Sequence, residues 1–327
     1  MKRLLAVVVA VVMIVGAVLL RDRIDGDDGG GGSGRSGDRI RLVCDSTLAD
    51  VCSRLADAND DLDVVVRESG ATTDELASDG GELDADAWLT TSAWPDVVAD
   101  NRRFEELDGE VLGAPSEVLA RSPVMIATRA EGRADLEAAC GGAITWRCVG
   151  EQVPAGQRVG LSAPESAAGL TVLAAATDSW FGGDDYSTVD FEDPAFGLWF
   201  DDLTGASSST RFGRQSPLER AVSRVGEFST VGALESETSR LLTPNRGYVP
   251  IYAEPMVTAD VVLVPRDGLD APALVDDIGA DELRDALAAR GWRIDGRAPS
   301  GAQGPPALPD GSNLPDPGVL QSLRDRW

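Results

Sequence analysis

The sequence predicts an α/β protein in which a second lobe is inserted into the first, each lobe a mostly parallel sheet flanked by helices. Three successive strand–loop–helix units begin the region that we expect to fold, with strands at 39–44, 62–67 and 87–90. A loop containing Ser or Thr follows each strand, and a helical segment follows each loop. Strands that alternate with helices in this way are typical of a parallel sheet.

A further set of strand and helix patterns predicts the inserted lobe. A strand at 124–128 and another at 158–161 are followed by a loop at 162–169 and a helical stripe that runs to Thr177. The later predicted elements are a helix at 218–225, strands at 227–231 and 258–264, and an amphipathic helix at 281–290 that ends at Gly291. We therefore expect lobe I to comprise about 39–125 and 250–294, and lobe II about 126–249.

The N-terminal segment predicts export and membrane attachment. Lys2 and Arg3 precede an unbroken apolar run at 4–20, and Arg21 ends it. No clear A-x-A cleavage site follows, so residues 1–25 are expected to be an uncleaved signal anchor with the folded region outside the cell, in preference to a removed signal peptide. Residues 26–38 are rich in Gly and are expected to be a flexible linker.

The C-terminal segment has a different composition from the body. Residues 295–327 are rich in Pro and Gly and end in a short helix-like run at 319–327. We interpret this segment as a tail.

The four cysteines form two pairs with the same spacing, Cys44 with Cys52 and Cys140 with Cys148. An even count in an exported chain indicates disulfides, and the short separations favour these two pairings, although a crossed pairing is open. A four-cysteine zinc site is the alternative, but zinc ligands usually lie two to four residues apart within a pair. We expect two local disulfides.

Composition excludes several classes of function. The chain has 55 acidic and 29 basic residues, a formal charge of −26, which argues against nucleic acid as a partner. It has no histidine, and Lys2 is its only lysine, so a Ser–His nucleophile, a histidine-ligated zinc and a P-loop are excluded from the folded region. The acidic run at 184–193 lacks the spacing of a calcium-binding loop, and we expect no metal and no cofactor.

Several loops, in order, resemble the type II class of periplasmic solute-binding proteins and, within it, the molybdate-binding-like branch. The motifs are Asp45-Ser46-Thr47-Leu48, Glu68-Ser69-Gly70-Ala71-Thr72, residues 84–89 with Trp94, residues 160–164, Ala168-Gly169-Leu170, residues 250–253, and residues 289–293. The likeness covers roughly residues 39–294.

This resemblance implies a ligand held between two lobes. A strand that ends in a Ser- or Thr-bearing loop and leads into a helix presents hydroxyl groups and backbone N–H groups at one point, where oxygen-rich ligands bind. The implied ligand-binding residues are Ser46, Thr47, Ser69 and Gly70 from lobe I, Ala168, Gly169 and Thr230 from lobe II, and Tyr252 near the hinge. For each Ser or Thr before a helix, the alternative is an ordinary N-cap. Asp45 departs from the pattern, because its carboxylate repels an oxyanion.

The function that the resemblance implies is solute binding for an ABC-type uptake transporter, by closure of the two lobes. The alternative is a cell-surface ectodomain for sensing or protein interaction, including work with a von Willebrand factor A protein. We expect no catalysis: Gly160-Leu161-Ser162 resembles the start of a nucleophile elbow, but no histidine exists to activate Ser162.

Overall fold

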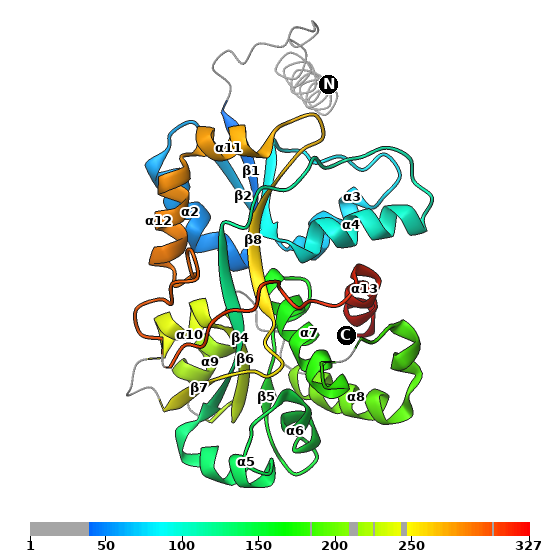
Figure 1. Cartoon of the computed structure of the whole chain (residues 1–327), viewed down its shortest axis with the longest axis vertical. Coiled ribbons are helices and arrows are strands. Elements are labelled where there is room, and N and C mark those ends of the chain that lie inside the picture. Colours follow the sequence, from blue (N-terminus) through cyan, green and yellow to red (C-terminus); the bar gives the residue numbers. More distant parts are fainter. Residues whose placement is uncertain (1–38, 184, 209–214, 225, 243–246, 303) are drawn as a thin grey trace, which may run out of the picture. The chain divides into compact units, whose positions relative to one another are not determined.

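The three predicted strand–loop–helix units are present at the start of the folded region in the computed structural model (Figure 1). The structure describes residues 39–183, 185–208, 215–224, 226–242, 247–302 and 304–327, and the chain from Arg39 onward forms one compact unit. The elements of these units are β1 Ile40–Asp45, α2 Ala49–Ala58, β2 Leu62–Arg67, α3 Ser69–Leu76, β3 Ala87–Thr91 and α4 Ala93–Phe104. Strands β2, β1 and β3 are adjacent and parallel, as predicted.

Two long strands carry the sheet from one lobe into the other. Strand β8, Thr258–Pro265, lies antiparallel to β3, and the first half of β4, Ala120–Arg129, pairs with β8. The second half of β4 pairs on its two sides with β6, Thr230–Leu234, and β7, Tyr248–Tyr252. The strand order is β2-β1-β3-β8-β4-β6-β5. The expected lobe boundary at residue 125 lies inside β4, which contributes to the sheet in both lobes.

The sheet of lobe II is mixed. The prediction of a mostly parallel sheet is therefore wrong for lobe II. Strand β4 runs antiparallel to both β6 and β7, and only the two-residue strand β5, Val159–Gly160, is parallel to β6. The physical reason is that β4 enters from lobe I, so its direction is set by its pairing with β8 and not by a helical crossover within lobe II.

Helices surround this sheet. In chain order they are α5 Arg133–Ala139, α6 Trp146–Glu151, α7 Ala167–Phe181, α8 Pro194–Ser208, α9 Pro217–Ser223, α10 Glu235–Leu241, α11 Ala271–Ile278, α12 Ala280–Ala289 and α13 Pro317–Arg326, with short 3₁₀ turns η1 Ser46–Leu48, η2 Ala130–Gly132 and η3 Thr188–Glu192. Helix α7 is apolar on nearly every side and largely buried, because it packs against α6, α13, β6 and the two long strands. The Ser166 hydroxyl caps its first turn by accepting from the N–H of Gly169.

Both predicted disulfides are confirmed. Cys44 at the end of β1 is bonded to Cys52 in α2, and Cys140 after α5 is bonded to Cys148 in α6. The first bond therefore fixes α2 to β1, and the second fixes α6 to the end of α5.

The C-terminal segment differs from a tail, because it crosses the body and ends in a packed helix. Backbone and side-chain bonds fasten the segment to the two long strands: the Arg121 guanidinium donates to the Pro309 carbonyl, and the N–H of Thr258 donates to the Ser312 carbonyl. Helix α13 then lies between α4 of lobe I and α7 of lobe II (Figure 1). Its residues Val319, Leu320 and Leu323 are buried, which explains why the helix stays there.

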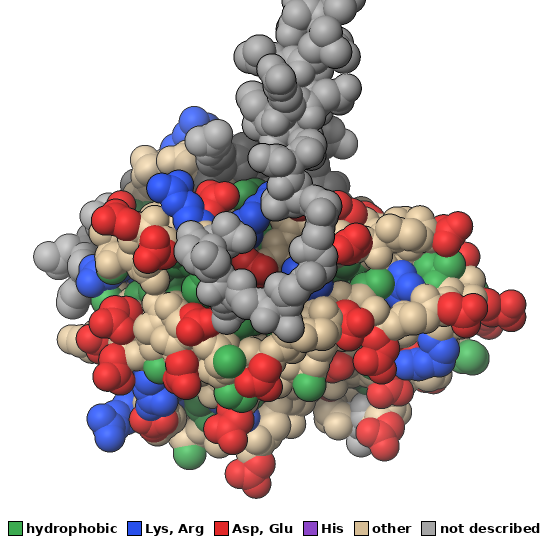
Figure 2. Space-filling model, turned by 90° about the horizontal axis from the view of Figure 1, so that it is seen from above, with side chains coloured by type: hydrophobic (Ala, Val, Ile, Leu, Met, Phe, Trp, Pro, Cys, Tyr) green, Lys and Arg blue, Asp and Glu red, His purple; other side chains and the backbone are tan. Residues whose placement is uncertain are grey.

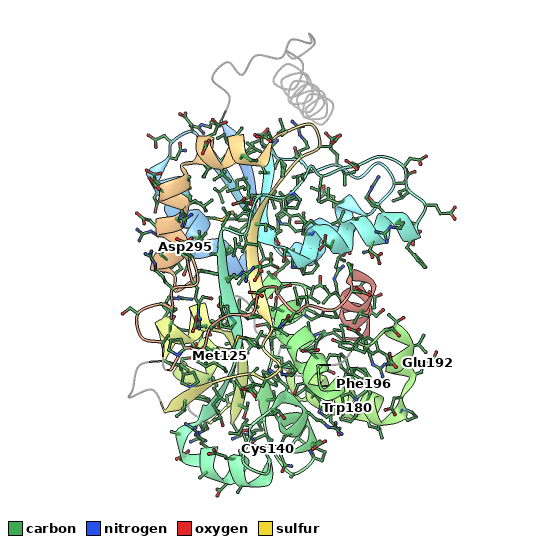
Figure 3. All side chains as sticks on the ribbon, viewed as in Figure 1. Met125, Cys140, Trp180, Glu192, Phe196 and Asp295 are labelled. Atoms are coloured by element: carbon green, nitrogen blue, oxygen red, sulfur yellow. A yellow bond between two sulfur atoms is a disulfide. The ribbon has the colours of Figure 1, made fainter. Side chains whose placement is uncertain are left out.

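Aromatic side chains of lobe II lie near the end of α13. The rings of Trp180 in α7 and Phe196 in α8 lie 6.1 Å apart, and Figure 3 shows both below α13. The Arg326 guanidinium lies 5.5 Å from the centre of the Phe196 ring.

The expected signal anchor and linker lie outside the described residues. Within the described ranges, no helix is both long enough and apolar enough to cross a membrane. Asp and Glu side chains are spread over the face shown in Figure 2, in keeping with the formal charge of −26 for the whole chain.

Candidate binding site between the lobes

The carboxylate of Asp45 is the centre of the contact between the two lobes. Asp45 ends β1 and is 0% exposed. Its Oδ1 atom accepts from the N–H of Thr47 at 2.7 Å, while its Oδ2 atom accepts from the N–H groups of Ser69 at 3.1 Å and Ala167 at 3.2 Å. Asp45 thus joins η1 and α3 of lobe I to α7 of lobe II.

The surroundings of this carboxylate have the chemistry of an anion site. Ser69 and Ala167 are the first residues of α3 and α7, so two helix N-termini, with their partial positive charge, face the same carboxylate. Burial raises the pKa of Asp45, and the hydrogen bonds from Ser69, Thr47 and Ala167 oppose that rise without cancelling it. The backbone groups that would hold a bound oxyanion are therefore already bonded to the protein's own carboxylate.

Two further bonds connect the lobes beside Asp45. The Thr47 hydroxyl accepts from the N–H of Ala168 at 3.0 Å, and the N–H of Gly70 donates to the Glu165 carbonyl at 2.8 Å. A Cβ atom on Gly70 would lie 1.9 Å from a carboxylate oxygen of Glu165, so a larger residue there would push the Glu165 side chain aside. The loops of the two lobes are in direct contact at this point.

The rim of the contact is acidic. The Ser46 hydroxyl donates to the Glu68 carboxylate at 2.6 Å. Burial raises the pKa of Glu68, the bond from Ser46 opposes the rise, and the nearby charges of Asp45 and Glu165 add to it. Such surroundings favour a cation, and the Arg324 guanidinium of α13 donates to Glu165 there.

The structure places the eight predicted ligand residues in three groups. Ser46, Thr47, Ser69, Gly70 and Ala168 lie in the network around Asp45 and its rim, and Gly169 lies one residue further along α7.

The remaining two predicted residues lie elsewhere. Thr230 begins β6 at the end opposite Leu234, where its hydroxyl accepts from Gln157 at 3.3 Å. The Tyr252 hydroxyl donates to Glu235 at 2.5 Å, and Glu235 forms a buried ion pair with Arg293. Neither shares a hydrogen bond with the Asp45 network.

The alternative N-cap roles of Ser46 and Ser69 are wrong. The N-cap residues of η1 and α3 are Asp45 and Glu68, and Ser69 is buried with its hydroxyl bonded to that of Thr90 at 2.8 Å. The sequence analysis did not predict that Asp45 organises this contact. A signal was present, because an Asp at the end of a strand commonly accepts a hydrogen bond from the backbone N–H two residues later.

No family model matches the sequence, and no curated protein matches it significantly. Solved structures do match. The periplasmic binding protein AfuA from Actinobacillus pleuropneumoniae, with bound fructose-6-phosphate, is 13% identical; the match covers 89% of this chain and 98% of AfuA with a TM-score of 0.57. A ferric binding protein from Campylobacter jejuni is 8% identical, with 88% and 98% covered and a TM-score of 0.56.

A third match is the Trichodesmium protein IdiA (FutA) in complex with iron and citrate ligands, which is 8% identical, with 88% and 96% covered and a TM-score of 0.52. At these identities the likeness shows the fold alone. The chain therefore has the two-lobed fold of periplasmic binding proteins, and the molybdate-binding-like branch is not singled out.

Proposed function

We propose that this chain is an extracellular binding protein that holds a small polar ligand between its two lobes, and that the ligand is not an anion. The fold supports binding between lobes. The observation that carries the proposal is the position of the Asp45 carboxylate, which takes the N–H groups at the starts of η1, α3 and α7. A molybdate-like oxyanion would meet these donors already bonded, with the carboxylates of Glu68 and Glu165 close by.

In this proposal the protein delivers its ligand to an ABC-type uptake transporter. The apolar run at 4–20 holds the chain in the membrane by a single span, with the folded unit outside the cell. The ligand enters when the lobes separate at the two long strands β4 and β8, and the acidic rim selects for positive charge or hydroxyl groups. No step of this function is catalytic.

Ligand screening of the full chain tests the proposal. In a thermal-shift assay we expect a saturable rise in Tm with at least one cationic amino acid, polyamine or polyhydroxylated solute, because binding to the native state alone stabilises it. Molybdate, sulfate and phosphate should give no more than the general effect of salt. Saturable binding of an oxyanion, or no response to any solute, would overturn the proposal.

A pair of matched variants localises the binding. Glu68→Gln removes one charge from the rim and should weaken a cationic ligand several-fold. Glu117→Gln, which removes an exposed charge from the loop before β4, should leave the affinity unchanged. Equal effects of the two changes would move the site away from the rim.

The second candidate is a cell-surface ectodomain for sensing or protein interaction, including work with a von Willebrand factor A protein. One observation favours it: helix α13 of the same chain lies between α4 and α7 of the two lobes. This candidate predicts a stable full chain that binds no solute of the panel, which is the outcome that overturns the first.

A further inference from the structure

The guanidinium of Arg324 lies between carboxylates that belong to different lobes. Its Nη1 and Nη2 atoms donate to the two oxygens of Asp74 in α3, both at 2.7 Å. Its Nη2 and Nε atoms donate to Glu165, just before α7, at 2.9 and 3.2 Å. This arrangement is the paired, planar geometry by which carboxylates recognise a guanidinium.

The rest of the surroundings also suit a cation. The Arg324 side chain is 8% exposed, and the centre of its guanidinium lies 5.9 Å from the ring of Trp94, a fully buried residue of α4. Burial by itself would lower the pKa of Arg324, but the bonds from Asp74 and Glu165 outweigh it and raise the pKa, so the group stays charged. The aromatic ring and the acidic groups from both lobes thus surround the guanidinium, while the carboxylates of Asp74 and Glu165 stay 63% and 44% exposed to solvent.

This site is continuous with the candidate binding site. The same Glu165 accepts through its carbonyl from the N–H of Gly70, and a Cβ atom on Gly70 would lie 3.0 Å from Arg324. Asp45 bonds to Ala167, two residues after Glu165. The guanidinium therefore lies at the point where the loops of the two lobes meet.

We propose that Arg324 is an internal ligand of the interlobe site, and that the site takes a guanidinium or similar organic cation once α13 withdraws. This inference rests on the proposed function and names the ligand class of that site. Helix α13 holds Arg324 at a high local concentration, because Val319, Leu320 and Leu323 are buried. A free cation must compete with that local concentration, so the helix lowers the apparent affinity of the site.

The test measures binding of agmatine to full-chain variants by calorimetry. Arg324→Ala should bind agmatine at least tenfold more tightly than the unchanged chain, because the competing side chain is gone. Ser322→Ala is the control on the same helix; its hydroxyl donates to the Gly318 carbonyl within α13, and its loss should leave agmatine affinity unchanged. A second change, Asp74→Asn in the Arg324→Ala background, should remove most of the gain.

The outcomes separate the inference from the proposed function. If Arg324→Ala gains no affinity for agmatine while the unchanged chain binds a solute of the panel, Arg324 is a structural strap and only the inference fails. If neither chain binds any solute, both fail. Should Arg324→Ala not fold, Arg324→Gln keeps the test open, since it retains bulk and hydrogen bonding without the charge, and the same tenfold gain is required of it.

Discussion

Replacing Asp45 by Ala is expected to lower the free energy of unfolding by about 3 to 5 kcal/mol. The change leaves the N–H groups of Thr47, Ser69 and Ala167 without their acceptor in a place that is fully buried. Each buried donor left unsatisfied costs about 1 to 3 kcal/mol, and relief from burying a carboxylate offsets part of the sum. Urea unfolding of the full chain measures the loss.

A rescue experiment shows whether the carboxylate occupies an anion site. With the side chain shortened, sulfate can reach the two helix N-termini, so its stabilisation of Asp45→Ala should exceed its stabilisation of the unchanged chain. Sulfate also stabilises proteins in general, and comparing the two proteins removes this general effect. Asp45→Asn is the matched variant: it keeps the size but not the charge, and should be intermediate in stability without the rescue. An Asp45→Ala protein as stable as the unchanged chain would contradict the assigned bonds.

Replacing Arg293 by Ala is expected to lower the free energy of unfolding by about 3 to 5 kcal/mol as well. Its side chain and that of Glu235 are each 1% exposed, and the two form a paired contact at 2.6 and 2.7 Å. Glu235 also accepts from the Tyr252 hydroxyl. Loss of one partner leaves a buried charge uncompensated, which is far more costly than loss of a surface pair.

The control is an ion pair of the same types on the surface. Arg284 contacts Asp295 at 2.6 Å with both side chains about half exposed, so Arg284→Ala should cost less than about 1 kcal/mol. Similar losses for Arg284→Ala and Arg293→Ala would contradict the role given to burial. The cluster also accounts for Tyr252, because its hydroxyl donates to Glu235 and shares no hydrogen bond with the Asp45 network.

Much of the fold follows from local patterns. Strands and helices alternate so regularly in the three units of β1, β2 and β3 that a parallel sheet is expected. The two cysteines of each pair are also close in sequence, which favours a local disulfide. Lobe II was harder, because the direction of β4 depends on its partner β8, which lies more than a hundred residues later. Periodicity identifies a strand but not the partner that orients it.

The candidate site divides in the same way. Loops that follow β1 and β2 are close because parallel strands end at one edge, so Ser46, Thr47, Ser69 and Gly70 were placed together from the sequence. Thr230 was expected in the same site but lies elsewhere, because it begins β6 and therefore lies at the amino end of that strand. No sequence pattern indicated the role of Arg324. Its partners Asp74 and Glu165 lie 250 and 159 residues earlier, and Arg324 itself lies in a segment whose Pro and Gly content is typical of a tail.

Hydrogen exchange of single amides, followed by NMR on the full chain without added ligand, tests most directly whether the interlobe site is occupied from within. The amides of Ser69, Gly70, Ala167 and Ala168 donate to groups of the chain itself, three of them across the lobes. We expect them to exchange far more slowly than the amides of an exposed turn, because they are released only when the lobes separate. Exchange at the rate of an exposed turn such as that at Gly268 would show an open, solvated site and contradict the account.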